Sequence, residues 1–304
     1  ASERGPARWW RGPVSLDQLA QSLGVGRDRI ASATVFTTAS VLDGVTAMAE
    51  LARSTPAPVL LEDWTIHQPD GGDGRVNYRA VYQAPEYRHA DQKWKFEDGQ
   101  PLVSEQVGLE VFMAVSDAST SEARIPVIFG HGLGGDKDGN WGTAGRLAEL
   151  NVAVFSIDSP HHGSRSDDPD SSIKPIFSFF GIDSDTNEFV IGRARDNFRQ
   201  MASDQLELVK LIRSLETLDM LPEGAPDGIP DLDTSRILYI GHSFGAVQGP
   251  TVFALAPEIH HAVWNVGGAG LMSLLRDSGT FSVLVSAVTL SVQKDASVER
   301  LLVA

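Results

Sequence analysis

A chain of 304 residues is long enough to bury a sizeable core, either as one large α/β domain or as two small ones. Its 42% hydrophobic residues and 29 glycines are typical of a globular, turn-rich protein and exclude a disordered chain. The formal net charge of −15 argues against nucleic acid and anionic membrane surfaces as partners, and the absence of cysteine excludes disulfides and thiolate metal sites.

The two ends of the sequence lack targeting and membrane signals. The chain opens at Ala1 without Met and without a charged-then-apolar signal segment, so we expect a processed or excerpted chain. The most apolar stretch, Leu271–Val292, is interrupted by Arg276, Asp277 and Gly279. It therefore falls short of the roughly eighteen uninterrupted apolar residues that a membrane helix needs.

The first part of the chain predicts an N-terminal extension rich in strands. Residues 1–12 have the composition of an irregular arm, in which Trp9 and Trp10 need a surface to lie on. The later patterns predict a helix over Ser15–Gly24, a strand over Arg29–Ser40, a helix over Ser40–Ser54 and mostly strand between Val76 and Val115. We expect the extension to occupy residues 1–74 and a main domain to occupy residues 75–304.

From Ile125 onward the pattern changes to alternating strands and helices. Continuous apolar runs predict strands over residues 125–130, 152–158, 236–241 and 260–268. Helical spacing predicts helices between them over residues 142–151, 193–216 and 246–256. This alternation is typical of a parallel sheet flanked by helices, which is an α/β fold.

The stretch "RILYIGHSFGAVQG" places a Gly-x-Ser-x-Gly motif between a buried strand and a helix. In a nucleophile elbow the serine, here Ser243, occupies a strained turn, and small residues at Gly241 and Gly245 let the two backbones approach closely. His242 lies inside the same motif. The turn raises the serine hydroxyl above the carboxyl edge of the sheet, next to the start of a helix. The alternative is a tight strand–helix turn whose serine has no chemical role.

A second glycine-rich loop follows an earlier buried strand. It carries His131, Gly132, Leu133 and Gly134 within "FGHGLGGDKD". Acyl transfer needs two convergent N–H donors for the tetrahedral oxyanion. We expect one donor from Phe244, which follows Ser243, and the other from Leu133 or Gly134. The alternative is a phosphate-binding loop, but the Lys-Ser/Thr of a Walker motif and the spacing of a dinucleotide fingerprint are both missing.

Residues 125 to about 270, with "HGLGG", "DSPHHGSR" and "GHSFGA" in that order, resemble the α/β-hydrolase superfamily. The longer stretch from "SATVFTTAS" through "GLEVFMAVS" to "PDGIPDLDTSRILYIGHSFG" is similar to large bacterial extracellular lipases and esterases. The resemblance implies an α/β-hydrolase fold and ester hydrolysis through a Ser-His-Asp triad with no cofactor. It also implies a secreted or cell-surface location in a bacterium.

The resemblance places the acid and then the histidine on loops after later strands. Here the last two histidines, His260 and His261, open the strand after the elbow helix, so we expect them at the opposite edge of the sheet from Ser243. Asp277 and Asp295 are candidate acids, but no histidine follows them in this sequence. We therefore expect a chain that is incomplete at its C-terminus, with the catalytic His and Asp on a missing segment or on a second polypeptide.

Two upstream histidines offer an alternative base. His161 and His162 follow the strand over residues 152–158, and so lie on the correct edge of the sheet. Either one could serve Ser243, or both could belong to an ordered loop that borders the substrate pocket. His131 lies in the oxyanion loop, where we expect it to shape the backbone.

Three further segments leave alternatives open. Oxygen ligands in the loop over residues 225–233 fit either a calcium site or a solvated acidic turn, and the candidate ligands are Asp227, Asp231 and Asp233. Residues 280–292 fit either a lid helix or a core element. An aromatic stretch fits either an apolar acyl site or core, through Phe177, Phe179 and Phe180; we expect Arg195, Asp196 and Asn197 to make structural polar contacts.

The sequence thus predicts a serine hydrolase that cleaves a small-molecule or lipid ester through an acyl-enzyme on Ser243. A peptidase, thioesterase or polyester depolymerase would use the same fold. The alternative from another class is a non-catalytic fragment or degenerate hydrolase that acts as a binding or assembly module. The absence of a histidine after His261 favours that alternative, and the two oxyanion elements favour the enzyme.

Overall fold

The computed structural model describes residues 16–29, 42–67, 74–118, 120–140, 146–147, 150–168, 170–171, 173–183, 185–186, 188–222 and 226–268. The chain divides into two compact units, Ala1–Leu42 and Asp43–Ala304. In the first unit a helix, α1 (Leu16–Leu23), is followed by a 3-10 turn, η1 (Arg27–Arg29). Helix α1 confirms the helix predicted over Ser15–Gly24.

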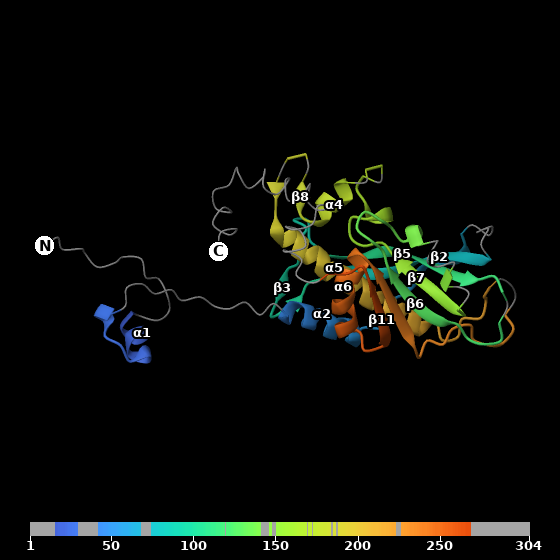
Figure 1. Cartoon of the computed structure of the whole chain (residues 1–304), viewed down its shortest axis with the longest axis horizontal. Coiled ribbons are helices and arrows are strands. Elements are labelled where there is room, and N and C mark those ends of the chain that lie inside the picture. Colours follow the sequence, from blue (N-terminus) through green and yellow to red (C-terminus); the bar gives the residue numbers. More distant parts are fainter. Residues whose placement is uncertain are drawn as a thin grey trace. The chain divides into compact units, whose positions relative to one another are not determined.

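The second unit is built on one seven-stranded sheet with the order β1-β2-β5-β7-β6-β10-β11. Strands β7 (Val152–Ile157), β6 (Ile125–Gly130), β10 (Ile237–His242) and β11 (Ile259–Asn265) run parallel to one another. The remaining three extend the sheet in antiparallel fashion: β5 (Glu105–Ser116), β2 (Arg75–Glu86) and β1 (Leu60–Ile66). The order brings β6 and β10 together at the centre of the parallel part (Figure 1).

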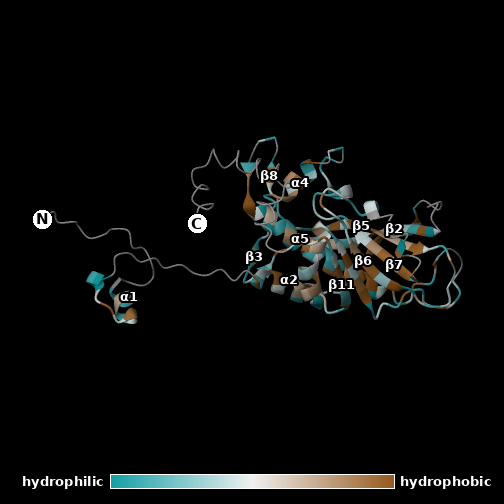
Figure 2. Ribbon diagram, viewed as in Figure 1, coloured by the Kyte–Doolittle hydropathy of each residue, from teal (hydrophilic) through white to brown (hydrophobic). Residues whose placement is uncertain are grey.

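The sheet has apolar side chains on both faces because its strands alternate between two cores. In β5, Val111, Met113 and Val115 belong to the larger core, whereas Phe112 and Ala114 belong to a smaller one. Successive residues of a strand point to opposite faces, so each core lies on its own side of the sheet. Figure 2 shows the resulting hydrophobic colouring along β6 and β7.

Three helices cover the larger core: α2 (Asp43–Ser54), α5 (Ile191–Ser214) and α6 (Phe244–Leu255). Helix α5 contributes Leu208, Val209 and Ile212 to that core from one side of the helix, as the sequence predicts. A shorter helix, α4 (Lys174–Phe179), precedes a small hairpin whose two strands, β8 (Ile182–Asp183) and β9 (Glu188–Phe189), have two residues each. Two more 3-10 turns and a second small hairpin complete the described elements: η2 (Asp138–Asn140), η3 (Gly163–Arg165), β3 (Phe96–Glu97) and β4 (Gln100–Pro101).

The two compact units meet at Leu42 and Asp43, whereas the predicted extension runs to residue 74. Strand β1 pairs with β2, and α2 contributes Met48 to the main core, so α2 and β1 both pack with the sheet of the second unit. The cause is β1, which adds to the antiparallel edge of the sheet through its pairing with β2.

Several predicted features lie outside the described residues. These are the arm with Trp9 and Trp10, most of the strand over residues 29–40, most of the helix over residues 142–151, the candidate acids Asp277 and Asp295, and the segment over residues 280–292. The other predicted strands and helices are confirmed within a few residues. Among the helices that the structure describes, none is both long enough and apolar enough to cross a membrane.

Candidate active site

Ser243 stands at the turn between β10 and α6, with φ of 52° and ψ of −108°. A non-glycine residue at positive φ is strained, and such strain persists where the surroundings over-determine it. Here the N–H of Ser243 donates to the carbonyl of Asn265 at the end of β11 (2.9 Å), and its carbonyl accepts from the amides of Ala246 (2.9 Å) and Val247 (3.0 Å). The backbone on both sides of the serine is therefore fixed.

Small residues let the strand, the helix and the neighbouring strand meet at this turn. A Cβ on Gly241 would lie 2.6 Å from the amide nitrogen of Ala246, and one on Gly245 would overlap the carbonyl group of Gly130 at the end of β6. The hydroxyl of Tyr239 donates to the carbonyl of Gly245 (2.9 Å), which secures the first turn of α6. The glycine spacing of the motif thus has the steric cause that the sequence predicts.

The glycine-rich loop after β6 lies against Ser243. A Cβ on Gly132 would lie 3.6 Å from the Cβ of Ser243, and the carbonyl of His131 accepts the N–H of Gly245 (3.0 Å). The N–H of Gly135 donates to the carbonyl of Gly132 (3.0 Å), which places Leu133 and Gly134 at the corner of a tight turn. The loop and the elbow are therefore one hydrogen-bonded assembly.

The two expected oxyanion donors, Phe244 and Leu133, both lie beside one apolar cluster. The N–H of Phe244 is the first amide of α6, and a helix leaves its first amides without partners inside the helix. The side chains of Leu133 and Phe244 both join an apolar cluster with Phe179, Phe180 and Met201. Gly134 is exposed and has φ of 74°. The two expected oxyanion residues therefore share one apolar surface.

His131 supports the loop rather than reacting. It is buried; the N–H of Ser159 donates to its Nε2 (3.0 Å), so its Nδ1 carries the proton and donates to the carbonyl of Gly132 (2.8 Å). Burial lowers the pKa of His131 despite the carbonyl of Gly132. The neutral ring therefore joins the loop after β6 to the loop after β7.

His162 lies beside the residue that follows the serine. Its ring stacks on Phe244 (5.9 Å between centroids, 21° between planes) and meets the edge of Phe179 (5.8 Å). Its Nδ1 donates to the carbonyl of Pro160 (2.9 Å), and its buried Nε2 has no hydrogen-bond partner among the residues that the structure describes. Burial, and then the nearby His131, lower the pKa of His162 to about 4.

His161 points the other way, into a buried polar cluster. Nη1 of Arg88 donates to its Nε2 (3.2 Å) and also to Oδ1 of Asn197 on α5 (2.9 Å). Burial, followed by the charges of Arg88 and Arg165, lowers the pKa of His161 to about 3. Since its acceptor nitrogen already has a partner, His161 is not placed as a base for Ser243.

The polar cluster extends through charged residues from β2, η3 and α5. Glu86 accepts two hydrogen bonds from the Arg88 guanidinium (2.8 and 2.7 Å), and Arg165 forms an ion pair with Asp204 (2.5 Å). Burial would raise the pKa of Glu86, but the contacts with Arg88 outweigh it and lower the pKa. The cluster fixes the loop after β7 against α5 and so determines where His161 and His162 lie.

A second buried ion pair joins the loops after β6 and β7. Asp158 accepts from the amide (2.7 Å) and Nζ (3.1 Å) of Lys137 and from the amide of Ser164 (2.8 Å). Burial alone would raise the pKa of Asp158, yet the charge of Lys137 and these hydrogen bonds lower it. Lys137 also contacts Glu110 (2.6 Å). The position of the glycine-rich loop therefore depends on a charge at the end of β7.

The remaining histidines do not complete a triad. Nδ1 of the exposed His242 lies 3.0 Å from Nδ2 of Asn265. His261 pairs with Leu238 near the start of β10, so it and His260 lie at the opposite edge of the sheet from Ser243, as predicted. All eight histidines fall within the described residues, and none of them has a hydrogen bond to Ser243 there: His67, His89, His131, His161, His162, His242, His260 and His261.

Comparison with solved structures decides the fold. An acetyl xylan esterase from a Paenibacillus species superposes with a TM-score of 0.54 at 15% identity, over 86% of this chain and 70% of that one. The chain has the α/β-hydrolase fold. An acetyl xylan esterase from a Thermoanaerobacterium species gives a TM-score of 0.49 at 13% identity, over 81% of this chain and 66% of that one. No family model and no curated protein matches the sequence.

Each of the three candidate calcium ligands contacts a different part of the chain. Asp231 accepts the amides of Met220 (2.6 Å) and Leu221 (2.8 Å), while Asp233 pairs with Arg236 (2.8 Å). Asp227 accepts the amide of Ile229. Among the described residues no three metal-ligating side chains gather, and these carboxylates contact the loop backbone and Arg236.

The polar cluster around Arg88 is the part of the site that sequence reasoning missed. Its members lie far apart in the chain and have no shared motif. The expected structural contacts of Asp196 and Asn197 are confirmed: Asp196 accepts from Arg195 (2.8 Å), Arg199 (2.9 Å) and the amide of Trp94 (3.0 Å). The charged members of the cluster are Glu86, Arg88, Arg165 and Asp204, and they come from three separate parts of the sequence.

Proposed function

We propose that this protein is a serine hydrolase of carboxylic esters, with Ser243 as its nucleophile. The observation that carries the proposal is the strained Ser243 at the start of α6, with the loop over residues 131–135 packed against it. The α/β-hydrolase fold, which a solved acetyl xylan esterase shares, supports it. Acyl and alcohol specificity do not follow from the fold.

In the proposed reaction, Oγ of Ser243 attacks the acyl carbonyl carbon and gives its proton to a general base. The carbonyl oxygen becomes an oxyanion, which the amides of Phe244 and Leu133 stabilise. The tetrahedral intermediate then expels the alcohol, which takes the proton from the base. A water molecule attacks the acyl-enzyme by the same route and releases the carboxylic acid. No metal or organic cofactor takes part in these steps.

The base in this proposal is a histidine from a further segment of polypeptide. A general base acts best when its pKa lies near the working pH, and pKa values of about 4 for His162 and about 3 for His161 are too low for that. In this proposal the further segment docks at the outer edge of the sheet, along β11. Most of β11 is exposed there, including Val263 (57%) and Trp264 (39%), although parallel strands are normally buried.

The location in the proposal is secreted or cell-surface, as the resemblance to extracellular lipases and esterases implies. The net charge of −15 is compatible with it.

The competing function is a binding or assembly module that has no acyl chemistry. Among the described residues Ser243 has no hydrogen bond to a histidine, and this observation favours the module.

Labelling with a fluorophosphonate probe tests the proposal, read by intact mass with and without added imidazole, which replaces a missing histidine. We expect slow labelling that imidazole accelerates, with no adduct in Ser243→Ala. Fast labelling without imidazole that is lost in Ser243→Ala would uphold the nucleophile and overturn the external base. If folded protein gives no serine adduct under either condition, Ser243 is not a nucleophile and the binding module is correct.

A further inference from the structure

The hydroxyl of Tyr239 lies where three elements of the candidate active site meet. Tyr239 is buried on β10, four residues before Ser243, and its hydroxyl donates to the carbonyl of Gly245 in the first turn of α6 (2.9 Å). A Cβ on Gly130, the last residue of β6, would overlap the same hydroxyl. One oxygen atom, carried by β10, therefore lies between the end of β6 and the start of α6.

Glycines on one face of α6 make room for this tyrosine. Gly245 and Gly249 are four residues apart and so lie on the same side of the helix. A Cβ on Gly249 would lie 2.8 Å from the ring of Tyr239, and this ring also packs on Trp264 of β11 (5.7 Å between centroids). Burial raises the pKa of Tyr239, so its hydroxyl keeps its proton and remains a donor.

The two amides expected to hold the oxyanion belong to the two elements that this hydroxyl separates. Phe244 precedes Gly245 in α6, and Leu133 lies in the loop that leaves β6 after Gly130. The N–H of Gly245 also donates to the carbonyl of His131 in that loop (3.0 Å). Donors stabilise an oxyanion when they stand about 2.7–3.1 Å from it, so the spacing between β6 and α6 controls how well both amides reach it.

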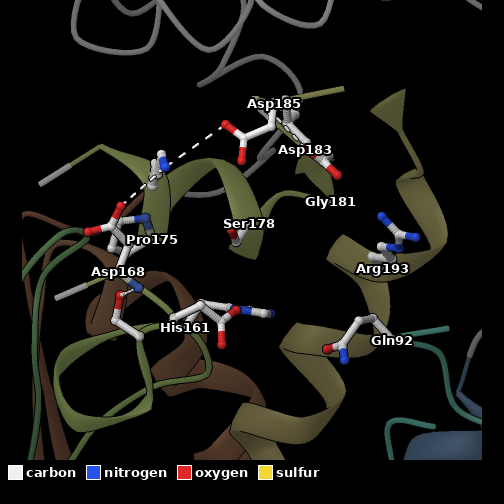
Figure 3. A pocket seen from close by; sticks show the side chains of 13 residues that line it. Gln92, His161, Asp168, Pro175, Ser178, Gly181, Asp183, Asp185 and Arg193 are labelled. Carbon is white, nitrogen blue, oxygen red and sulfur yellow. Dashed lines mark hydrogen bonds and ion pairs between the residues drawn. The ribbon is translucent and has the colours of Figure 1, made fainter. Parts of the chain in front are cut away.

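The other buried polar side chains near Ser243 hold different parts of the site. His131 and the pair of Lys137 and Asp158 join the loop after β6 to the loop after β7. His161 faces a separate cavity of about 390 Å³, which is lined by the loop after β7, by α4 and by the start of α5 (Figure 3). Tyr239 is therefore the side chain placed to fix α6 against the end of β6.

We propose that the hydroxyl of Tyr239 is a spacer that sets the distance between the two oxyanion amides, which makes Tyr239 a positioning residue for Ser243. This role rests on the hydrolase function proposed above. Without the hydroxyl, a gap of one oxygen atom opens between Gly130 and Gly245, and α6 is free to shift toward β6. A shift of the donors slows the step in which charge develops on the oxyanion, but it leaves the binding of the rest of the substrate unchanged.

Fluorophosphonate labelling of Tyr239→Phe with added imidazole tests the proposal, read by intact mass over a range of probe concentrations. In this reaction Oγ of Ser243 bonds to phosphorus, fluoride leaves, and imidazole takes the proton. We expect the limiting labelling rate to fall about tenfold, which is less than the roughly 100-fold loss on removing a whole oxyanion donor. The probe concentration that gives half of the limiting rate should stay unchanged.

Tyr82→Phe is the matched control, because it removes another buried tyrosine hydroxyl, one that donates to the carbonyl of Asp204 on α5 (3.5 Å). It should label at the rate of the wild type even if urea unfolding shows an equal loss of stability in the two variants. Should Tyr239→Phe not fold by circular dichroism, Gly130→Ala displaces the same hydroxyl from the side of β6 and carries the same expectation.

Three results would overturn the spacer role while the hydrolase function stands. These are folded Tyr239→Phe that labels as fast as the wild type, equal slowing in Tyr82→Phe, and a changed half-rate concentration with an unchanged limiting rate. If the wild type itself gives no serine adduct, the hydrolase function is wrong and the spacer role is wrong with it. The wild-type labelling thus distinguishes the two failures.

Discussion

At Gly245 the turn between β10 and α6 has no room for a side chain, because a Cβ would overlap the backbone of Gly130. We therefore expect Gly245→Ala to lower the free energy of unfolding by roughly 1–3 kcal/mol, the usual cost of overpacking. It should also slow fluorophosphonate labelling, since α6 would move away from the loop that holds His131. Urea unfolding and intact mass measure the two effects.

Gly192→Ala is the matched control for that change. Gly192 lies in the first turn of α5, where a Cβ would meet only the flexible side chains of Lys93 (3.5 Å) and Arg195 (4.0 Å). Alanine favours helix, so stability should stay equal or rise by up to about 1 kcal/mol. Equal destabilisation by the two substitutions would contradict a special packing requirement at Gly245.

Single residues also mark how far the sequence leads. Ser243, Gly241 and Gly245 could be placed because a turn between a strand and a helix is a local event with a fixed spacing. The opposite directions of His161 and His162 could not be, because they depend on Arg88 and on Phe244. These contacts join residues that are 73 and 82 positions apart, and such contacts leave no periodicity in the sequence.

Between elements, the pair of Lys137 and Asp158 joins the loops that follow β6 and β7. Asp158→Asn would remove the charge that faces Lys137 and place an amide against the N–H donor of Ser164. Breaking a buried ion pair from one side costs about 3–5 kcal/mol, and we expect a loss of that size in urea unfolding. Labelling of Ser243 should slow as well, because Lys137 belongs to the loop that carries Leu133.

The exposed pair of Asp233 and Arg236 provides the comparison. Asp233→Asn should cost no more than about 1 kcal/mol, because exposed pairs gain little in water. A similar loss of unfolding free energy in Asp158→Asn and Asp233→Asn would contradict this reasoning. It would mean that burial does not make the pair of Lys137 and Asp158 stronger than the pair of Asp233 and Arg236.

The elements themselves were largely predictable, since β6, β7 and β10 are short apolar runs that full burial in a parallel sheet requires. Strand β1 was not, because five of its seven residues are exposed and its membership of the sheet depends on pairing with β2. An edge strand carries little hydrophobic pattern, so the sequence does not indicate that β1 joins the sheet.

At the scale of the whole molecule, His162 makes stability depend on pH. Its pKa is about 4 in the folded protein and about 6.5 when exposed, so between these values the unfolded chain binds the extra proton. The free energy of unfolding should therefore fall as the pH falls through this range, by up to about 1.4 kcal/mol per pH unit. Other groups, including the carboxylates behind the net charge of −15, titrate over overlapping ranges.

Comparison with His162→Gln separates this contribution from the others. The remaining charges are the same in both proteins, so their effects cancel in the difference, and only the wild type loses stability through His162. We expect the free energy of unfolding of the wild type to exceed that of the variant most near neutral pH. The difference should shrink toward about pH 4. Urea unfolding at several pH values measures it, and His161→Gln should behave alike because the pKa of His161 is about 3. A difference that stays constant across this range would mean that water reaches the imidazole of His162. The packing of His162 on Phe244 beside Ser243 would then not be closed.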